Sequence, residues 1–272
     1  MQDQERTTNL AFYKFTPIAD PAALRDELQE LCESLGIKGT ILLAHEGINA
    51  MLAGSPEACE RLEGAITAVD DIGELWFKRS ESREVPFGKL VVKVKPEIVT
   101  MRVDGVDACA ATGKQLPPET FRDWLRGGEE MIVIDTRNDY EYDLGTFRGA
   151  INPNTAAFHE FPEYVEQRRD ELQDTKVVMF CTGGIRCEKA TSWMLDEGLG
   201  DVYQLEGGVL NYFERIEDAD KDWQGELFVF DGRVAVDTRL AETDTVLCDE
   251  CGAPVRGGVE PVCGCAGRAK DE

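Results

Sequence analysis

The sequence contains very little histidine, little positive charge and no long apolar run. Only 2 histidines occur among 272 residues, and 53 acidic residues outnumber 29 lysines and arginines, which gives a formal net charge of −24. A charge of this sign disfavours non-specific binding of nucleic acid by the chain as a whole. No apolar stretch approaches the roughly 20 residues that span a bilayer, and the polar residues 1–6 predict no secretory signal. We therefore expect a cytoplasmic protein without a membrane partner.

The 9 cysteines indicate thiol or metal chemistry, because a reducing cytoplasm disfavours disulfides. Residues 181–187 are the most informative, reading Cys-Thr-Gly-Gly-Ile-Arg-Cys between the apolar run 177–180 and a predicted helix. Adjacent glycines allow successive N–H groups to converge as an anion nest, and the helix N-terminus adds positive potential. Together with Arg186, these groups are expected to lower the pKa of the Cys181 thiol and to hold it as a nucleophilic thiolate. The alternative is a buried structural cysteine before an ordinary turn.

The candidate site is therefore this loop. Its predicted catalytic residues are Cys181, Arg186 and Cys187, and its loop residues are Thr182, Gly183, Gly184 and Ile185. Cys187 has two interpretations of equal weight: it resolves an oxidised or persulfide form of Cys181, or it packs the helix against the sheet.

The spacing and the flanks of the loop resemble the rhodanese family, whose active-site cysteine carries a persulfide. Four residues separate Cys181 from Arg186, one fewer than in the loop with which cysteine phosphatases wrap a phosphate. Residues 132–152 resemble the first half of a rhodanese domain, and residues 202–208 resemble its closing strand and turn. We interpret Asp135, Arg137 and Glu141 within the first of these segments as a buried ion-pair network that braces the sheet edge, with a role in assisting catalysis as the alternative.

The N-terminal hundred residues alternate strand and helix patterns that begin in the order βαββαβ. We predict strands at 10–15, 39–43, 48–52, 74–77 and 90–94, and helices at 21–35 and 58–69. This order is typical of a ferredoxin-like or acylphosphatase-like α+β sandwich. The predicted fold is thus α/β overall: this α+β domain, a rhodanese-like domain with a parallel sheet, and a small Cys-rich tail. The predicted boundaries are 1–100, a linker at 101–118, the rhodanese-like catalytic domain at 119–222, and a hairpin with the tail at 223–272.

Over most of its length, the chain resembles the rhodanese-domain proteins that hydroxylate C5 of the wobble uridine in tRNA. The resemblance rests on residues 45–49, 87–90, 97–100, 181–189 and 225–231. It implies a tRNA-modifying enzyme with Cys181 as the catalytic thiolate, the anticodon arm as partner and molecular oxygen as co-substrate. No flavin or nicotinamide motif is present, and the histidines lie too far apart in sequence to predict a 2-His-1-carboxylate iron site. The alternatives are a sulfurtransferase that carries a persulfide on Cys181, and a non-catalytic RNA-binding or scaffold protein.

Positive charge gathers locally between residues 76 and 102, where basic side chains outnumber acidic ones and aromatic residues are interspersed. This mixture suits structured RNA, because cations bind phosphates and rings stack on unpaired bases. The alternative is a solvated hairpin whose aromatic residues face the core. The predicted RNA-binding residues, including one histidine from a glycine-containing turn, are Lys78, Arg79, Arg83, Lys89, Lys93, Lys95 and His45. For His45, a hydrogen bond within its own loop is an alternative of equal weight.

The end of the chain carries four cysteines that could hold a structural zinc ion. Cys248 and Cys251 have the two-residue spacing of a zinc knuckle, whereas Cys263 and Cys265 are separated by one residue, which is less typical. We predict a tetrahedral zinc site, with a flexible thiol-bearing tail as the alternative.

Overall fold

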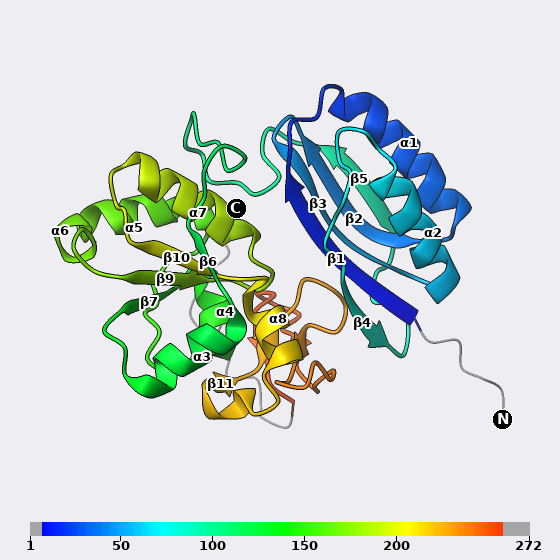
Figure 1. Ribbon diagram of the computed structural model, residues 1–272. Coiled ribbons are helices and arrows are strands. Elements are labelled where there is room, and N and C mark those ends of the chain that lie inside the picture. Colours follow the sequence, from blue (N-terminus) through cyan, green and yellow to red (C-terminus); the bar gives the residue numbers. More distant parts are fainter. Residues whose placement is uncertain (1–6, 258–272) are drawn as a thin grey trace.

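Two β-sheets, one in each half of the chain, organise the structure (Figure 1). The structure is a computed structural model that describes residues 7–257. A five-stranded sheet occupies the N-terminal domain, and a four-stranded parallel sheet occupies the second domain.

The N-terminal sheet has the strand order β4-β1-β3-β2-β5. Its neighbouring strands are antiparallel except for β2 and β5, which run parallel. The strands are β1 (Thr7–Phe15), β2 (Lys38–Ala44), β3 (Gly47–Gly54), β4 (Lys78–Ser82) and β5 (Leu90–Val94). The predicted α+β architecture is confirmed, but the fourth strand begins four residues later than predicted, because residues 74–77 form no strand.

Two helices cover one face of this sheet and leave the other face open toward the second domain (Figure 1). They are α1 (Pro21–Ser34), capped by the Asp20 carboxylate, and α2 (Pro56–Thr67), capped by the Ser55 hydroxyl. Because side chains alternate along a strand, Ile41 and Leu43 of β2 pack into the core beneath the helices. Thr40 and Leu42 project to the open face, where they line a cavity.

The second sheet has the order β6-β10-β9-β7, with all strands parallel. Its strands are β6 (Lys114–Leu116), β7 (Ile132–Asp135), β9 (Val177–Phe180) and β10 (Val202–Leu205). Apolar side chains fill both faces of this sheet, in two separate core clusters. One face packs against α3 (Pro118–Gly127) and α8 (Gly208–Arg215), and the other against α5 (Phe161–Gln167), α6 (Arg169–Leu172) and α7 (Ile185–Asp196). This is the predicted parallel α/β domain.

Shorter elements complete the domain and attach the C-terminal segment to it. They are α4 (Asp139–Leu144), β8 (Gly145–Phe147), β11 (Trp223–Gly225), β12 (Leu227–Phe228), β13 (Ala235–Val236), β14 (Val246–Leu247) and β15 (Pro254–Val255). Strand β11 pairs with β8, and β12 pairs antiparallel with β13 within the segment for which a hairpin was predicted. The predicted linker at 101–118 contains β6, so the parallel sheet already begins at Lys114.

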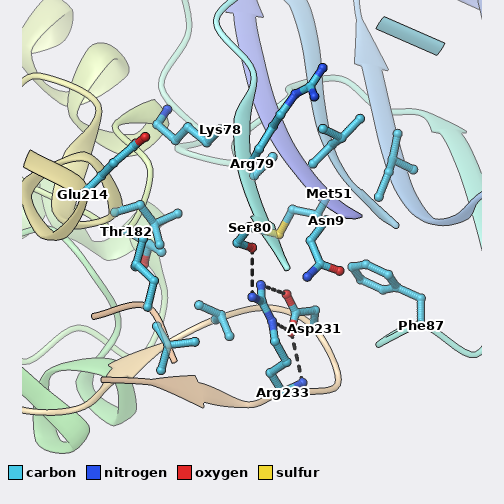
Figure 2. A pocket seen from close by; sticks show the side chains of 17 residues that line it. Asn9, Met51, Lys78, Arg79, Ser80, Phe87, Thr182, Glu214, Asp231 and Arg233 are labelled. Atoms are coloured by element: carbon cyan, nitrogen blue, oxygen red, sulfur yellow. Dashed lines mark hydrogen bonds and ion pairs between the residues drawn. The ribbon is translucent and has the colours of Figure 1, made fainter. Parts of the chain in front are cut away.

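The C-terminal segment also reaches back to the N-terminal domain. Figure 2 shows Arg233 of this segment between Asp231 and Ser80 of β4; its guanidinium lies 2.6 Å from the Asp231 carboxylate and 2.9 Å from the Ser80 hydroxyl. Across the described residues 7–257, no helix has the length and apolar character needed to cross a membrane.

Candidate active site

The loop that carries Cys181 follows β9 at the carboxyl end of the parallel sheet, the edge at which α/β proteins place their ligands. Gly184 precedes α7 with φ of +105°, a conformation that favours glycine. A Cβ at this position would lie 2.7 Å from the Tyr13 hydroxyl of the N-terminal domain. The chain therefore turns sharply here, with β1 of the other domain packed directly against the turn.

The loop carbonyl groups point away from the Cys181 sulfur because other groups hold them. The first two N–H groups after Gly208 at the start of α8, those of Val209 and Leu210, donate to the carbonyl oxygens of Cys181 (3.0 Å) and Thr182 (3.1 Å). The close approach needs glycine at position 208, where a Cβ would lie 2.4 Å from the Cys181 oxygen. With its carbonyl groups held outward, the loop can turn N–H groups toward the sulfur, as the anion-nest interpretation predicts.

Three donors converge on the Cys181 sulfur. The Gly184 N–H donates to Sγ at 3.1 Å, the Arg186 N–H donates to it as well, and the Cys187 thiol supplies a third hydrogen bond. Burial raises the pKa of Cys181, but the Cys187 hydrogen bond, the Arg186 charge and the two N–H groups outweigh it and lower the pKa to about 5. Cys181 is therefore a thiolate at neutral pH.

The Arg186 guanidinium is held by a carboxylate of α4. Its two terminal nitrogens lie 2.7 and 2.9 Å from the oxygens of Glu141, which is fully buried. Burial raises the pKa of Glu141, but the charge of Arg186 and its hydrogen bonds outweigh burial and lower it. Glu141 of α4 therefore contacts the active loop (residues 181–187) through Arg186, whereas Asp135 and Arg137 form their own fully buried ion pair at 2.6 Å.

Cys187 lies in the first turn of α7 with its side chain completely buried. Its sulfur lies 3.4 Å from the Thr136 hydroxyl in addition to its hydrogen bond with Cys181. Burial and the neighbouring Cys181 thiolate raise the pKa of Cys187, so it remains a protonated thiol. The site thus places one thiol beside one thiolate.

A cavity of about 470 Å³ lies above the Cys181 sulfur and is built by both domains. The open face of the N-terminal sheet supplies one wall, and the loop and the 157–159 segment supply another. Its aromatic and polar side chains include Tyr13, Asn49, Phe87, Asn138, Phe158, His159 and Phe230. His159, the second of the two histidines, therefore lies at the cavity.

The predicted RNA-binding residues are distributed over both edges of the N-terminal sheet. Arg79 on β4 forms an ion pair with Glu63 of α2, and exposed Arg83 follows the same strand. On β5 at the opposite edge, Lys93 is in register with the cavity-lining Leu42, so its side chain projects to the open face. Lys89 and Lys95 flank this strand and are exposed.

Two further candidates lie close to the contact between the domains. Exposed His45 occupies the turn between β2 and β3, where its Nδ1 lies 3.0 Å from the Ile18 carbonyl oxygen. Lys78 differs from the other predicted RNA-binding residues, because its Nζ donates to the carbonyl oxygen of Gly183 in the active loop at 2.9 Å.

Three groups at the site were not predicted from the sequence. Tyr13 of β1 donates to Glu188 of α7 at 3.3 Å and packs against the active loop. Asn138 lines the cavity, and its side-chain oxygen is buried without a hydrogen-bond partner within the described structure. Lys189 of α7 lies 2.8 Å from Glu46 and 2.6 Å from Glu97, which ties the two domains together.

The predicted zinc site falls partly outside the described residues, because Cys263 and Cys265 lie beyond residue 257. Cys248 is half-buried and Cys251 is exposed, at the turn between β14 and β15. Within residues 7–257, no group of three or more histidine, cysteine or acidic side chains is arranged to hold a metal ion. The zinc site stays a prediction.

The fold and the loop define a rhodanese-type thiolate protein with an added N-terminal acylphosphatase-like domain. Residues 117–215 match the family model of the rhodanese-like domain, and residues 7–98 match that of the UPF0176 acylphosphatase like domain. Relatives from Brucella anthropi and Brucella ovis, both named tRNA uridine(34) hydroxylase, are 50% identical over 250 residues, which cover 91% of this chain and 81% of each relative. The chain belongs to this tRNA uridine(34) hydroxylase family. Among solved structures, a rhodanese-like domain protein from Staphylococcus aureus aligns with a TM-score of 0.32 and 18% identity, over 36% of this chain and 90% of its own.

Proposed function

We propose that this protein hydroxylates C5 of the wobble uridine in tRNA, with Cys181 as the catalytic thiolate and molecular oxygen as co-substrate. The names of its relatives supply the reaction and the substrate. The assignment of the reaction to Cys181 rests on one observation. The pKa of its thiol is lowered to about 5, and its sulfur lies beneath a cavity that both domains line. A thiolate at such a place is a nucleophile for a small electrophilic ring.

Uracil offers such an electrophile, because its C5–C6 double bond is conjugated with the carbonyl at C4. Addition of the Cys181 thiolate forms a bond from sulfur to C6 and moves the double-bond electrons into an enolate over C5 and O4. The enolate carbon then bonds to dioxygen, which takes up a proton and becomes a hydroperoxide on C5. Dioxygen is thereby reduced by two electrons.

Two more electrons are needed to cleave the O–O bond, and the thiols of Cys181 and Cys187 supply them when they form a disulfide. The Cys187 thiol attacks the terminal oxygen of the hydroperoxide and becomes a sulfenic acid, which leaves a hydroxyl group on C5. Loss of the C5 proton and of the Cys181 sulfur restores the C5–C6 double bond. Cys181 then displaces hydroxide from the oxidised Cys187, which forms a disulfide and water. Overall, uridine, dioxygen and two thiols give 5-hydroxyuridine, water and a disulfide, which an external thiol reduces.

The cavity walls supply groups that suit a uracil ring. Asn138 lines the cavity, and a turn of its side chain would bring the buried, unpartnered amide oxygen to the N3–H group of uracil and remove the cost of leaving this acceptor without a partner. Phe230, which is 43% exposed and lines the cavity, offers a ring on which a base can stack.

The anticodon arm would bind along the open side of the N-terminal sheet. Lys89, Lys93 and Lys95 at β5 are exposed, and Lys93 shares its face with a cavity-lining residue. Ion pairs between these lysines and the phosphates of the arm would offset the electrostatic repulsion between tRNA and a chain whose net charge is −24. Arg83 and His45 remain further candidates for contacts with the same arm.

The rhodanese-type loop keeps a sulfurtransferase as the second candidate function, with a persulfide on Cys181. The test supplies the purified protein with unmodified tRNA under isotopically heavy dioxygen and, separately, with radiolabelled thiosulfate. Hydroxylation predicts one heavy oxygen in the wobble nucleoside by mass spectrometry. Labelled sulfur transferred from Cys181 to an acceptor, without oxygen in the nucleoside, would overturn the proposal in favour of the second candidate.

A further inference from the structure

The carbonyl groups of the active loop are held outward by two different domains. The carbonyl oxygens of Cys181 and Thr182 accept N–H groups of α8, which belongs to the same domain as the loop. The next one, that of Gly183, accepts the Nζ of Lys78, which comes from β4 of the N-terminal domain. The second domain therefore contributes directly to the conformation of the loop.

Lys78 binds the same peptide group that donates to the catalytic sulfur. The carbonyl of Gly183 and the N–H of Gly184 belong to one planar unit, in which a trans peptide points the oxygen and the hydrogen in opposite directions. Lys78 lies 2.9 Å from the oxygen of this unit, and the Cys181 sulfur lies 3.1 Å from its nitrogen. A rotation of the peptide plane would break both hydrogen bonds together.

We propose that Lys78 is a positioning residue for the Cys181 thiolate, which it supports by fixing and polarising the Gly183–Gly184 peptide. A cation at the carbonyl oxygen strengthens the N–H of the same peptide as a donor, because hydrogen bonds in a chain polarise one another. The inference rests on the proposed role of Cys181 as a thiolate, and it extends that role to a side chain of the N-terminal domain.

The surroundings of Lys78 hold the ammonium in this place. Its Nζ lies 4.6 Å from the ring centre of Trp76 and 5.3 Å from that of Tyr13, which allows cation–π attraction from two sides. The charged groups that act on it are Cys181, Glu188 of α7 and Glu214 of α8. Burial lowers the pKa of Lys78 to about 8 against the opposing effect of these three groups, so the side chain is charged at neutral pH.

Arg79, the next residue on β4, provides a matched control for Lys78, because successive side chains of a strand point to opposite faces of the sheet. Figure 2 shows Lys78 and Arg79 leaving β4 on opposite sides, with Lys78 on the side of Thr182 and Glu214. Arg79 instead forms an ion pair with Glu63 on the helix-covered side. Both substitutions remove one positive charge from the same strand, but only the change at Lys78 removes the contact to the loop.

The test measures the pKa of the Cys181 thiol in the full-length protein, from the pH dependence of its alkylation by iodoacetamide with peptide-resolved mass spectrometry. Lys78→Met, which keeps the aliphatic stem, is expected to raise this pKa by about one unit, so that alkylation near pH 5 slows roughly fivefold. Arg79→Met should leave the profile of the wild-type protein unchanged, and Lys78→Arg should restore most of it.

A profile of Lys78→Met that coincides with that of the wild-type protein would overturn the inference, whether or not tRNA binding is weakened. If Lys78→Met does not fold, Lys78→Gln gives the same comparison, because its polar side chain suits the domain contact while the charge is absent. Failure of the thiolate role on which the inference rests is distinguishable, because the wild-type thiol itself would then titrate near 9, its ordinary value. Failure of hydroxylation alone would appear as absent 5-hydroxyuridine with an unchanged alkylation profile of the wild-type protein.

Discussion

Gly208→Ala tests the packing that holds the active loop. Gly208 has φ of +68° at the start of α8, where the following N–H groups hold the carbonyl oxygens of Cys181 and Thr182. An added Cβ would lie 2.4 Å from the first oxygen and 2.7 Å from the second. Both are backbone atoms that cannot rotate away, so either the loop or the helix must move.

Gly198→Ala is the matched control for backbone strain. Gly198 follows α7 with φ of +84°, is exposed, and would have nothing within 4 Å of an added Cβ. Each substitution forces alanine into the left-handed region, which costs about 1–2 kcal/mol. Overpacking at Gly208 adds roughly 1–3 kcal/mol, so its total loss of unfolding free energy should be about 2–5 kcal/mol.

The assays are urea unfolding followed by tryptophan fluorescence, and the alkylation rate of Cys181 at neutral pH. Gly208→Ala should lower both the stability and the alkylation rate, because a displaced loop no longer aims its N–H groups at the sulfur. Gly198→Ala should lower the stability alone. Equal losses of stability in the two variants, with unchanged alkylation in both, would refute the assigned role of Gly208.

Three further predictions follow from the charges and thiols of the protein. Because the pKa of Cys181 is lowered to about 5, the thiolate is present above that pH and lost below it, so kcat/KM should fall as the pH drops through about 5; a rate that instead keeps rising up to about pH 9 would show an unperturbed thiol. Lys89→Glu combined with Lys93→Glu should weaken tRNA binding at least ~10-fold at low salt and reduce its salt dependence, whereas Arg61→Glu on α2, behind the sheet, should not. Equal affinities of these variants would place the RNA surface elsewhere. If the four late cysteines bind zinc, reduced protein should carry about one metal ion per chain, and its absence by metal analysis would rule the site out.

The sequence allowed prediction of the features that depend on neighbouring residues. The loop from Cys181 to Arg186 is continuous in sequence, so its glycines, its arginine and the following helix could be interpreted together. The alternation of apolar residues likewise predicted four of the five strands of the N-terminal sheet, and the order of these elements predicted the fold of that domain. The loop and its flanks predicted the rhodanese-like domain, and the family models confirm both domains.

The groups that complete the site come from distant parts of the chain. Lys78 lies 105 positions from the carbonyl group that it binds, and Tyr13 lies 175 positions from Glu188. A lysine on a strand is normally expected to be solvated, so only the register of β4 shows that Lys78 faces the loop. Glu141 was grouped with Asp135 and Arg137 because they are close in sequence, whereas the fold places its carboxylate against Arg186.

The most direct test of the central claim compares the wild-type protein with Cys181→Ser on unmodified tRNA in air. Nucleoside mass spectrometry measures 5-hydroxyuridine, and a binding assay with the same tRNA confirms that both proteins hold the substrate. Thiolate catalysis by Cys181 predicts hydroxylation by the wild-type protein and none by Cys181→Ser, at equal tRNA affinity. Hydroxylation by Cys181→Ser at the wild-type rate would contradict thiolate catalysis at this site.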